Sequence, residues 1–136
     1  MTHYESPVRH IPYAQQKVYD KLSDLDNIKS LQGKIPEDKI KNLSFDTDHV
    51  SFDISGMGTV QLEVVERTPI KCIKFETTKS PIPLTVWIQL VPVAEEECKM
   101  KITAGLEVNL FMKGIISKPV QEGLEKISEI LSMIQY

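Results

Sequence analysis

The sequence predicts an α+β fold in which an antiparallel sheet wraps around one long C-terminal helix. From Ile40 to Leu106, apolar residues alternate with polar ones in short runs separated by turn residues, which is the pattern of half-buried strands. From Ser117 to Tyr136, apolar residues instead recur every three or four positions, which places one apolar stripe along a helix. Consecutive strands joined by short turns form an antiparallel meander with one apolar face. We expect the helix to cover that face.

The size and composition of the chain indicate a single globular domain. It has 136 residues, of which 41% are hydrophobic and 26% are charged, and a domain of this size needs no disulfide or metal to stabilise it. The formal net charge of −3 argues against general nucleic-acid binding, which usually requires a basic patch. No apolar run is long enough to cross a membrane, and the first residues lack the pattern of a signal peptide. We therefore expect one domain over residues 1–136, located in the cytoplasm.

The N-terminal part of the chain is expected to form one strand and two short helices. Residues 3–11 have strand character, and Pro7 cannot donate to a ladder, so this strand should lie at a sheet edge or contain a bulge. Residues 14–23 carry a short helical stripe. A second short helix is expected from Leu25 to Gly33.

Six strands are expected in the alternating part of the chain, with Pro92 closing the fifth. Their apolar positions, strand by strand, are Leu43 and Phe45; Val50, Phe52 and Ile54; Val60, Leu62 and Val64; Ile73 and Phe75; Val86, Ile88 and Leu90; and Met100, Ile102, Ala104 and Leu106.

Trp87 breaks the alternation of the fifth of these strands, because it falls on the polar side. It should therefore lie on the outside of the sheet together with Val91, unless a one-residue bulge turns it inward. The sequence leaves both alternatives open. An outward Trp87 would favour a protein partner or a homodimer, because tryptophan is enriched at interfaces.

The C-terminal helix is expected to begin near Pro119, whose missing N–H costs nothing in a first turn. Its apolar stripe consists of Val120, Leu124, Ile127, Leu131 and Ile134. The preceding residues 109–116 are apolar without a period. Three interpretations of that segment stay open: a mobile flap at the mouth of a pocket, a packed loop, or a contact with a membrane surface.

The order of elements resembles that of the START-like, or SRPBCC, superfamily, which includes birch-pollen-allergen-like proteins, polyketide cyclases and aromatases, and lipid-transfer domains. Three local segments carry the resemblance: residues 18–24, which look like the family's first helix; residues 88–92 with 99–103, which look like its last two strands; and residues 114–120, which look like the entry into its final helix. The resemblance implies a helix-grip fold. In that fold, a curved seven-stranded antiparallel sheet grips the C-terminal helix, with a cavity between them.

A ligand site is expected in this cavity, because the strands present more apolar positions than one helical stripe covers. Gly123 lies next to the stripe, and either open space or a close approach of backbone to the sheet would explain a glycine there. A solid core therefore stays open as the alternative to a pocket. The candidate lining residues are Phe52, Ile54, Leu62, Phe75, Ile88, Met100, Ile102, Phe111, Met112, Leu124 and Ile127.

No motif in the sequence points to catalysis. The three histidines share no metal-ligand spacing, and the two cysteines form no CxxC pair. The run from Ser55 to Thr59 contains two glycines but lacks the spacing of a phosphate-binding loop, so it is interpreted as a turn between strands. We expect no metal, no cofactor and no catalytic residue.

Three functions follow from these observations. The preferred hypothesis is the binding or carriage of a small hydrophobic or lipid-like molecule, without chemistry. The second is an enzyme that resembles the polyketide cyclases and aromatases. The third is a protein-interaction module that acts through the outer face of the sheet.

Overall fold

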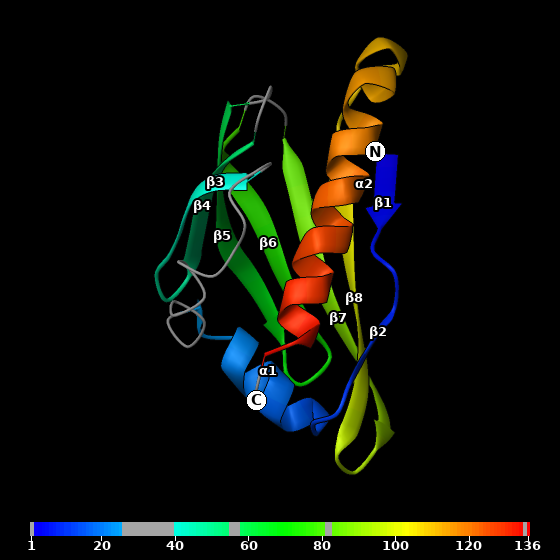
Figure 1. The fold of residues 1–136 in the computed structure, drawn as a ribbon. Helices are drawn as coiled ribbons and strands as arrows, with labels where there is room; N and C mark the ends of the chain where they lie inside the picture. The colour runs from blue at the N-terminus through cyan, green and yellow to red at the C-terminus, as the bar shows by residue number, and fades with distance from the viewer. Residues whose placement is uncertain (1, 26–39, 55–57, 81–82, 135) are drawn as a thin grey trace.

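The computed structural model contains a curved antiparallel sheet with a long helix on one face (Figure 1). It describes residues 2–25, 40–54, 58–80, 83–134 and 136. The strands are β1 (Thr2–Glu5), β2 (Arg9–Ile11), β3 (Ile40–Phe45), β4 (His49–Ile54), β5 (Gly58–Thr68), β6 (Cys72–Lys79), β7 (Leu84–Ala94) and β8 (Glu97–Leu106), and the helices are α1 (Gln15–Leu22) and α2 (Leu110–Ser132). The expected helix-grip α+β fold is confirmed.

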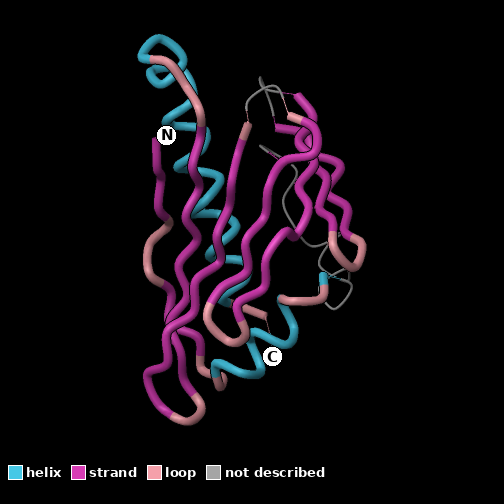
Figure 2. The backbone as a smooth tube through the Cα atoms, turned by 180° about the vertical axis from the view of Figure 1, so that it is seen from behind, coloured by secondary structure: helices cyan, strands magenta, loops and turns pink. Residues whose placement is uncertain are grey.

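The sheet order is β1-β8-β7-β6-β5-β4-β3, so the six strands from β3 to β8 form the expected meander (Figure 2). Because directly opposite residues in a ladder point to the same face, the register shows which side chains face the helix. Val60, Leu62 and Val64 of β5 are all buried, while the residues between them are more exposed. The period of two therefore predicted the helix-facing side of the strands correctly.

The expected first strand is divided into β1 and β2, which both pair with β8 at the end of the sheet order. Pro7 lies in the interruption, because a proline has no backbone N–H to donate to the neighbouring strand. Ser6 holds the interruption against β8, since its backbone N–H donates to the carbonyl of Ile102 at 2.8 Å and its hydroxyl accepts the N–H of Ile102 at 2.9 Å. The expectation that this strand lies at a sheet edge or is bulged at Pro7 agrees with the position of β1 at the end of the sheet order.

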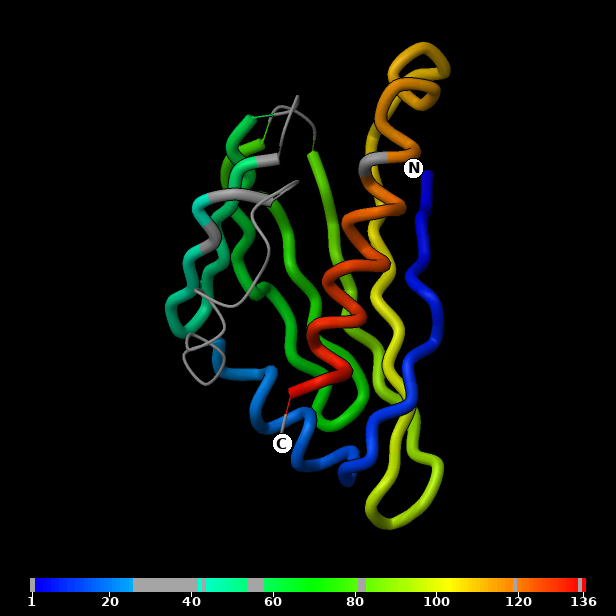
Figure 3. Tube along the Cα trace, viewed as in Figure 1, coloured from blue at the N-terminus to red at the C-terminus, as the bar shows by residue number. Residues whose placement is uncertain are grey.

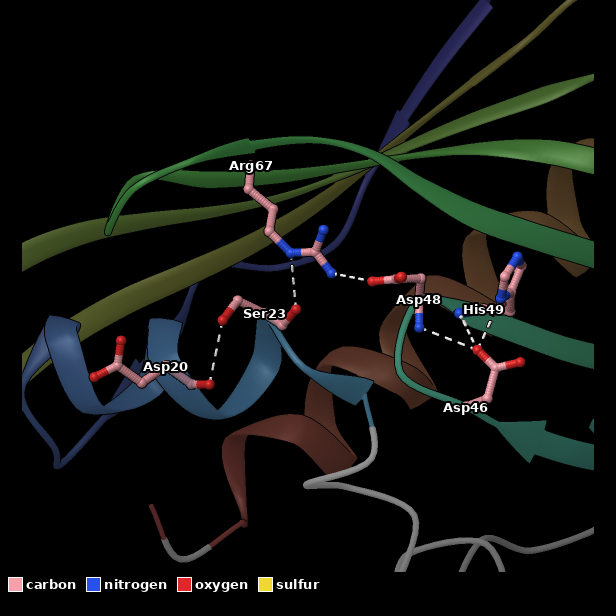
Figure 4. A network of polar contacts seen from close by, with 6 residues as sticks. All are labelled: Asp20, Ser23, Asp46, Asp48, His49 and Arg67. Carbon is pink, nitrogen blue, oxygen red and sulfur yellow. Dashed lines mark hydrogen bonds and ion pairs between the residues drawn. The ribbon is translucent and has the colours of Figure 1, made fainter.

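Helix α1 buries the three apolar residues of its stripe, Val18, Tyr19 and Leu22, and packs on β7 and β8. Its C-terminal end is hydrogen-bonded to strand β5 (Figure 4). Arg67 of β5 donates from Nε to the carbonyl of Ser23 at 2.9 Å and pairs through its guanidinium with the carboxylate of Asp48. The second short helix, expected from Leu25 to Gly33, falls almost entirely on residues outside the described part of the chain.

Helix α2 begins at Leu110, so the expectations of a start near Pro119 and of a separate flap over 109–116 are both wrong. Asn109 caps the helix, because its side-chain oxygen accepts the N–H of Met112 at 2.8 Å. Pro119 lies inside the helix and leaves the carbonyl of Ile115 without its usual amide donor. The Asn109 cap and the packing of Met112 and Ile116 stabilise the turns before Pro119, although proline usually occurs in the first turn of a helix.

Strand β7 continues to Ala94, so the expectation that Pro92 closes it is wrong. The pairing of β7 with β6 stops at Gln89, and beyond that residue β7 pairs, among the described strands, with β8 alone. A proline is tolerated where one side of a strand carries no ladder. The hairpin to β8 is tight, because Ala94 pairs directly with Glu97.

Candidate functional site: the helix-facing surface of the sheet

Most of the predicted lining residues lie together on the face of the sheet that α2 covers. Seven of them are buried in one apolar cluster: Phe52, Leu62, Phe75, Ile88, Met100, Ile102 and Leu124. Ile127 and Met112 are half-buried and pack against this cluster. The side chain of Ile54 lies outside the described part of the structure. Phe111 does not join this cluster, because 78% of its surface is exposed.

The apolar interior is not completely closed to solvent. Val86 faces α2, since its partners in the neighbouring strands are Phe75 and Ala104, and both of these are buried. Val86 itself is only half-buried. Three further half-buried sheet residues pack against the same cluster: Phe45, Val50 and Leu84. Apolar side chains that face the helix therefore remain accessible along the sheet.

Gly123 lies on the corresponding side of α2, where the half-buried Val120 and Ile127 stand about one turn away on either side. A Cβ atom built on Gly123 would meet no heavy atom of the described residues within 4 Å. Among the described residues, no backbone approaches Gly123 closely, contrary to that interpretation, and none of them fills the space beside the helix at this position.

The position of α2 explains how apolar surface stays accessible. The helix backbone packs mainly on β8, β1 and β2, which form one end of the sheet order. Figures 1 and 3 show α2 running along this end, with β3, β4 and β5 at the opposite side of the curved sheet. The helix-facing side chains of β3, β4 and β5 are therefore separated from the backbone of α2 by the width of the sheet.

Polar contacts fix α2 to the edge strands. The hydroxyl groups of Tyr4 in β1 and Ser117 in α2 lie 2.7 Å apart. Arg9 of β2 donates from Nε to the hydroxyl of the fully buried Ser128 at 3.1 Å and from Nη2 to the carbonyl of Glu125 at 3.1 Å. The sequence gives no signal for the role of Arg9, since nothing in a local pattern connects a short edge strand with a helix more than a hundred residues later.

Two titratable groups in the interior are held in their neutral forms. Burial raises the pKa of the Cys98 thiol, which makes it a poor nucleophile. Burial also raises the pKa of the Tyr136 phenol well above its ordinary value, and this hydroxyl donates to the carbonyl of Leu131 at 2.7 Å. Both groups therefore contribute packing and hydrogen bonding rather than charge.

A shallow hollow of about 420 Å³ lies beside α1, away from the predicted residues. It is lined by Lys17, Asp20, Lys21 and Tyr136, and Figure 3 shows the end of the chain next to α1. Its charged lining does not suit an apolar ligand, so we do not assign the predicted site to it.

Trp87 points to the outer face of the sheet, which decides between the two alternatives for this residue. The register continues without a bulge through Lys74, Trp87 and Thr103 on adjacent strands. The ring centroids of His3 and Trp87 lie 6.0 Å apart, and the Lys74 ammonium lies 5.9 Å from the indole centroid. These neighbours cover part of the indole, so Trp87 is half-buried rather than free.

The histidines do not converge. His3 contacts Trp87, His10 lies 3.3 Å from a carboxylate oxygen of Glu97, and the ring of His49 lies 2.8 Å from a carboxylate oxygen of Asp46. Within the described ranges, no group of three or more histidine, cysteine, aspartate or glutamate residues is placed to hold a metal ion.

Neither of the two described helices is both long and apolar enough to span a membrane.

Comparison with solved structures identifies the fold. A START superfamily protein from Mycobacterium smegmatis superposes with a TM-score of 0.60 and 13% identity, covering 95% of this chain and 98% of that one. Norcoclaurine synthase from Thalictrum flavum, solved with dopamine and hydroxybenzaldehyde, gives 0.70 and 14%, covering 96% and 83%. A protein from Thermus thermophilus gives 0.64 and 14%, covering 96% and 94%.

No family model matches the sequence, and neither does any curated protein. The likeness is therefore one of three-dimensional structure, which persists where sequence identity has fallen too low to be detected. The sheet order, the position of α2 and these superpositions agree with the resemblance in the sequence. The chain has the helix-grip fold of the START-like, or SRPBCC, superfamily.

Proposed function

We propose that this protein binds a small hydrophobic molecule between the helix-facing surface of the sheet and α2. The observation that carries the proposal is at Gly123, between the half-buried Val120 and Ile127, where a Cβ atom would meet no described atom within 4 Å. Half-buried Val86 on the sheet and Ile127 on the helix supply apolar surface that a ligand would remove from water. Burial of such surface stabilises a complex by about 25 cal/mol per Å².

The class of ligand is argued from the lining. The described helix-facing side chains are mostly aliphatic or aromatic, and the polar Thr77 among them accepts the N–H of Leu84. The buried polar side chains among the described residues, Ser6, Thr103 and Ser128, all have hydrogen-bond partners within the protein. A largely apolar molecule would therefore suit the surface. Norcoclaurine synthase, which has this fold, was solved with two small aromatic molecules, and this supports the idea that the fold accommodates such a ligand.

Two alternatives remain as predictions. The first is a cyclase or aromatase-like enzyme, for which the Tyr4 and Ser117 hydroxyls would be the nearest polar groups able to orient a substrate. The second is an interaction module that uses the outer face around Trp87 and Val91, of which Val91 is 58% exposed. We also retain the single domain and the cytoplasmic location as proposals, and the free thiols of Cys72 and Cys98 suit a reducing compartment.

The first test is a titration of the purified chain with a fluorescent apolar probe. Gly123→Phe should fill the space beside α2 and weaken probe binding about tenfold or more, since a blocked pocket loses the burial that drives affinity. Gly114→Phe is the matched control, because Gly114 also lies in α2 and also has open space at its Cβ, but is exposed to solvent. Unchanged binding in Gly123→Phe, with both variants folded, would contradict the proposal.

The second test is native mass spectrometry of the protein purified from its own host. A co-purified mass of lipid or small-aromatic size would support carriage and identify the ligand. If Gly123→Phe fails to fold, Val86→Phe tests the helix-facing surface of the sheet instead. Full probe binding by both variants would overturn the assignment of the site.

A further inference from the structure

The first turns of α2 carry a second apolar face, which points away from the protein. Leu110, Phe111 and Ile115 are 89%, 78% and 58% exposed, and Phe111 and Ile115 stand four positions apart on one side of the helix. Met112 and Ile116, on the other side, pack into the core or against it. This end of α2 is therefore apolar on both sides, although only one side has a partner within the chain.

The exposed apolar face stands clear of the sheet. Figures 1 and 2, which view the molecule from opposite sides, both show the beginning of α2 projecting beyond β1 and beyond the adjacent ends of the strands. A flat surface could approach these turns without meeting the rest of the protein first.

The charge of this segment is opposite to that of the chain. Residues 108–121 contain Lys113 and Lys118 and no acidic residue, with Glu107 and Glu122 just outside this stretch, whereas the whole chain has a formal net charge of −3. The first turn of a helix also presents partial positive charge from its free N–H groups. A local positive segment on a negative protein favours a negatively charged partner at this end.

The amount of exposed apolar surface separates two kinds of partner. A stable dimer usually buries about 800 Å² on each protomer, and three side chains at a helix tip provide well under that area. An interfacial helix, in contrast, binds a bilayer surface through a few large apolar side chains combined with lysines that meet anionic headgroups. The observations therefore favour a membrane surface over a second copy of the chain.

We propose that Leu110, Phe111 and Ile115, flanked by Lys113 and Lys118, dock on the surface of a bilayer that contains anionic lipid. The apolar side chains enter the headgroup region, and the lysines remain at the level of the lipid phosphates and carboxylates. This inference does not require a ligand in the interior. If both proposals hold, the docked face stands at one end of the helix that borders the interior site.

The test is flotation of the full chain with vesicles of phosphatidylcholine alone and with vesicles that also contain phosphatidylserine. We expect binding to the phosphatidylserine vesicles that weakens as salt is added, because exposed charges are screened. Since the chain as a whole is negative, such binding must come from a local positive site. Phe111→Ser should weaken it about tenfold, because a large apolar side chain no longer enters the bilayer.

Matched controls separate binding through this face from non-specific binding through other exposed residues. Ile115 and Val91 are both 58% exposed, so Ile115→Ser should weaken vesicle binding whereas Val91→Ser should not. Likewise, Lys118→Glu should abolish the preference for phosphatidylserine, whereas Lys99→Glu, at an exposed position of β8, should preserve it. Probe binding in the absence of vesicles should stay unchanged in Phe111→Ser, so failure of this inference is distinguishable from failure of the interior site.

Three outcomes overturn the inference. One is the absence of binding to either kind of vesicle, and another is an equal loss in Val91→Ser and Ile115→Ser. The third comes from sedimentation without lipid: self-association of the chain that Phe111→Ser abolishes would assign the face to a second copy instead.

Discussion

The side-chain amide of Gln15 in α1 donates a hydrogen bond to the backbone carbonyl of Ile70 at 2.6 Å. Ile70 has a φ of 60°, a left-handed conformation that is uncommon for a β-branched residue. It follows Pro69 in a turn closed by the bond from Lys71 N–H to the Thr68 carbonyl at 3.0 Å. The same amide also reaches the carbonyl of Leu90 at 3.3 Å. Gln15 thus joins α1 to an unfavourable turn and to the neighbouring strand.

Replacement of Gln15 by alanine should destabilise the protein by about 1–2 kcal/mol, because two partly buried carbonyls lose a donor. Urea unfolding measures the change. Gln16→Ala is the matched control, since the Gln16 amide bonds only to the exposed Asp20 carboxylate among the contacts described for it, and we expect a change of about 0.5 kcal/mol or less. Equal losses in the two variants would show that Gln15 does not anchor the turn.

Substitution of either glycine in α2 by alanine should stabilise the protein by about 0.5–1 kcal/mol. The physical reason is the lower conformational entropy of alanine in the unfolded chain, at positions where the new methyl group meets nothing within 4 Å. Thermal unfolding of Gly114→Ala and Gly123→Ala checks this expectation. Destabilisation by Gly123→Ala alone would mean that the space beside α2 is already filled.

The first turn of α2 should depend on Asn109. Asn109→Ala removes the acceptor for the Met112 N–H, which costs about 1 kcal/mol of helix stability at that end. Hydrogen exchange should therefore become faster at Met112 and Lys113 and stay unchanged near Ser128. Asn109→Asp, which keeps an acceptor, serves as the control. Slow exchange at Met112 in Asn109→Ala would argue against the cap.

The turn between β3 and β4 should give a pH-dependent contribution to stability. The hydrogen bond with Asp46 raises the pKa of His49, and the bond with His49 lowers the pKa of Asp46. A raised histidine pKa stabilises the fold below the unfolded value of about 6.5, and a lowered aspartate pKa stabilises it above the unfolded value of about 3.9. The contribution of the pair should therefore be present between about pH 4 and pH 6.5. It should be lost as pH rises through the folded pKa of His49 or falls through that of Asp46.

An NMR titration of His49 tests this pairing (Figure 4). Asp46→Asn should lower the pKa of His49, because it removes the largest cause of the increase. Asp48→Asn should lower it less, since Asp48 acts on His49 only through the weaker coulombic attraction. The opposite order of effects would contradict the assigned hydrogen bond.

Most of the fold could be predicted because strand parity is a local property. The alternation at Val60, Leu62 and Val64 survives unchanged in the structure, and the lack of a donor at Pro7 correctly marked an interrupted edge strand. Proline was misleading at the other two positions. A strand can continue through Pro92 because no strand pairs with β7 on its β6 side beyond Gln89 among the described residues. A helix can continue through Pro119 because its earlier turns make contacts of their own.

The sequence by itself determined the class of fold, the face of each strand that is buried and the apolar character of the candidate site, because these follow from the period of hydrophobic residues. Only the tertiary structure decided where α2 begins, that Trp87 faces outward, that no described residue fills the space beside Gly123 and that Phe111 is exposed on the surface. The reason is physical: a residue's period fixes its direction relative to its own strand or helix, whereas open space and exposure depend on how far apart separate elements come to rest.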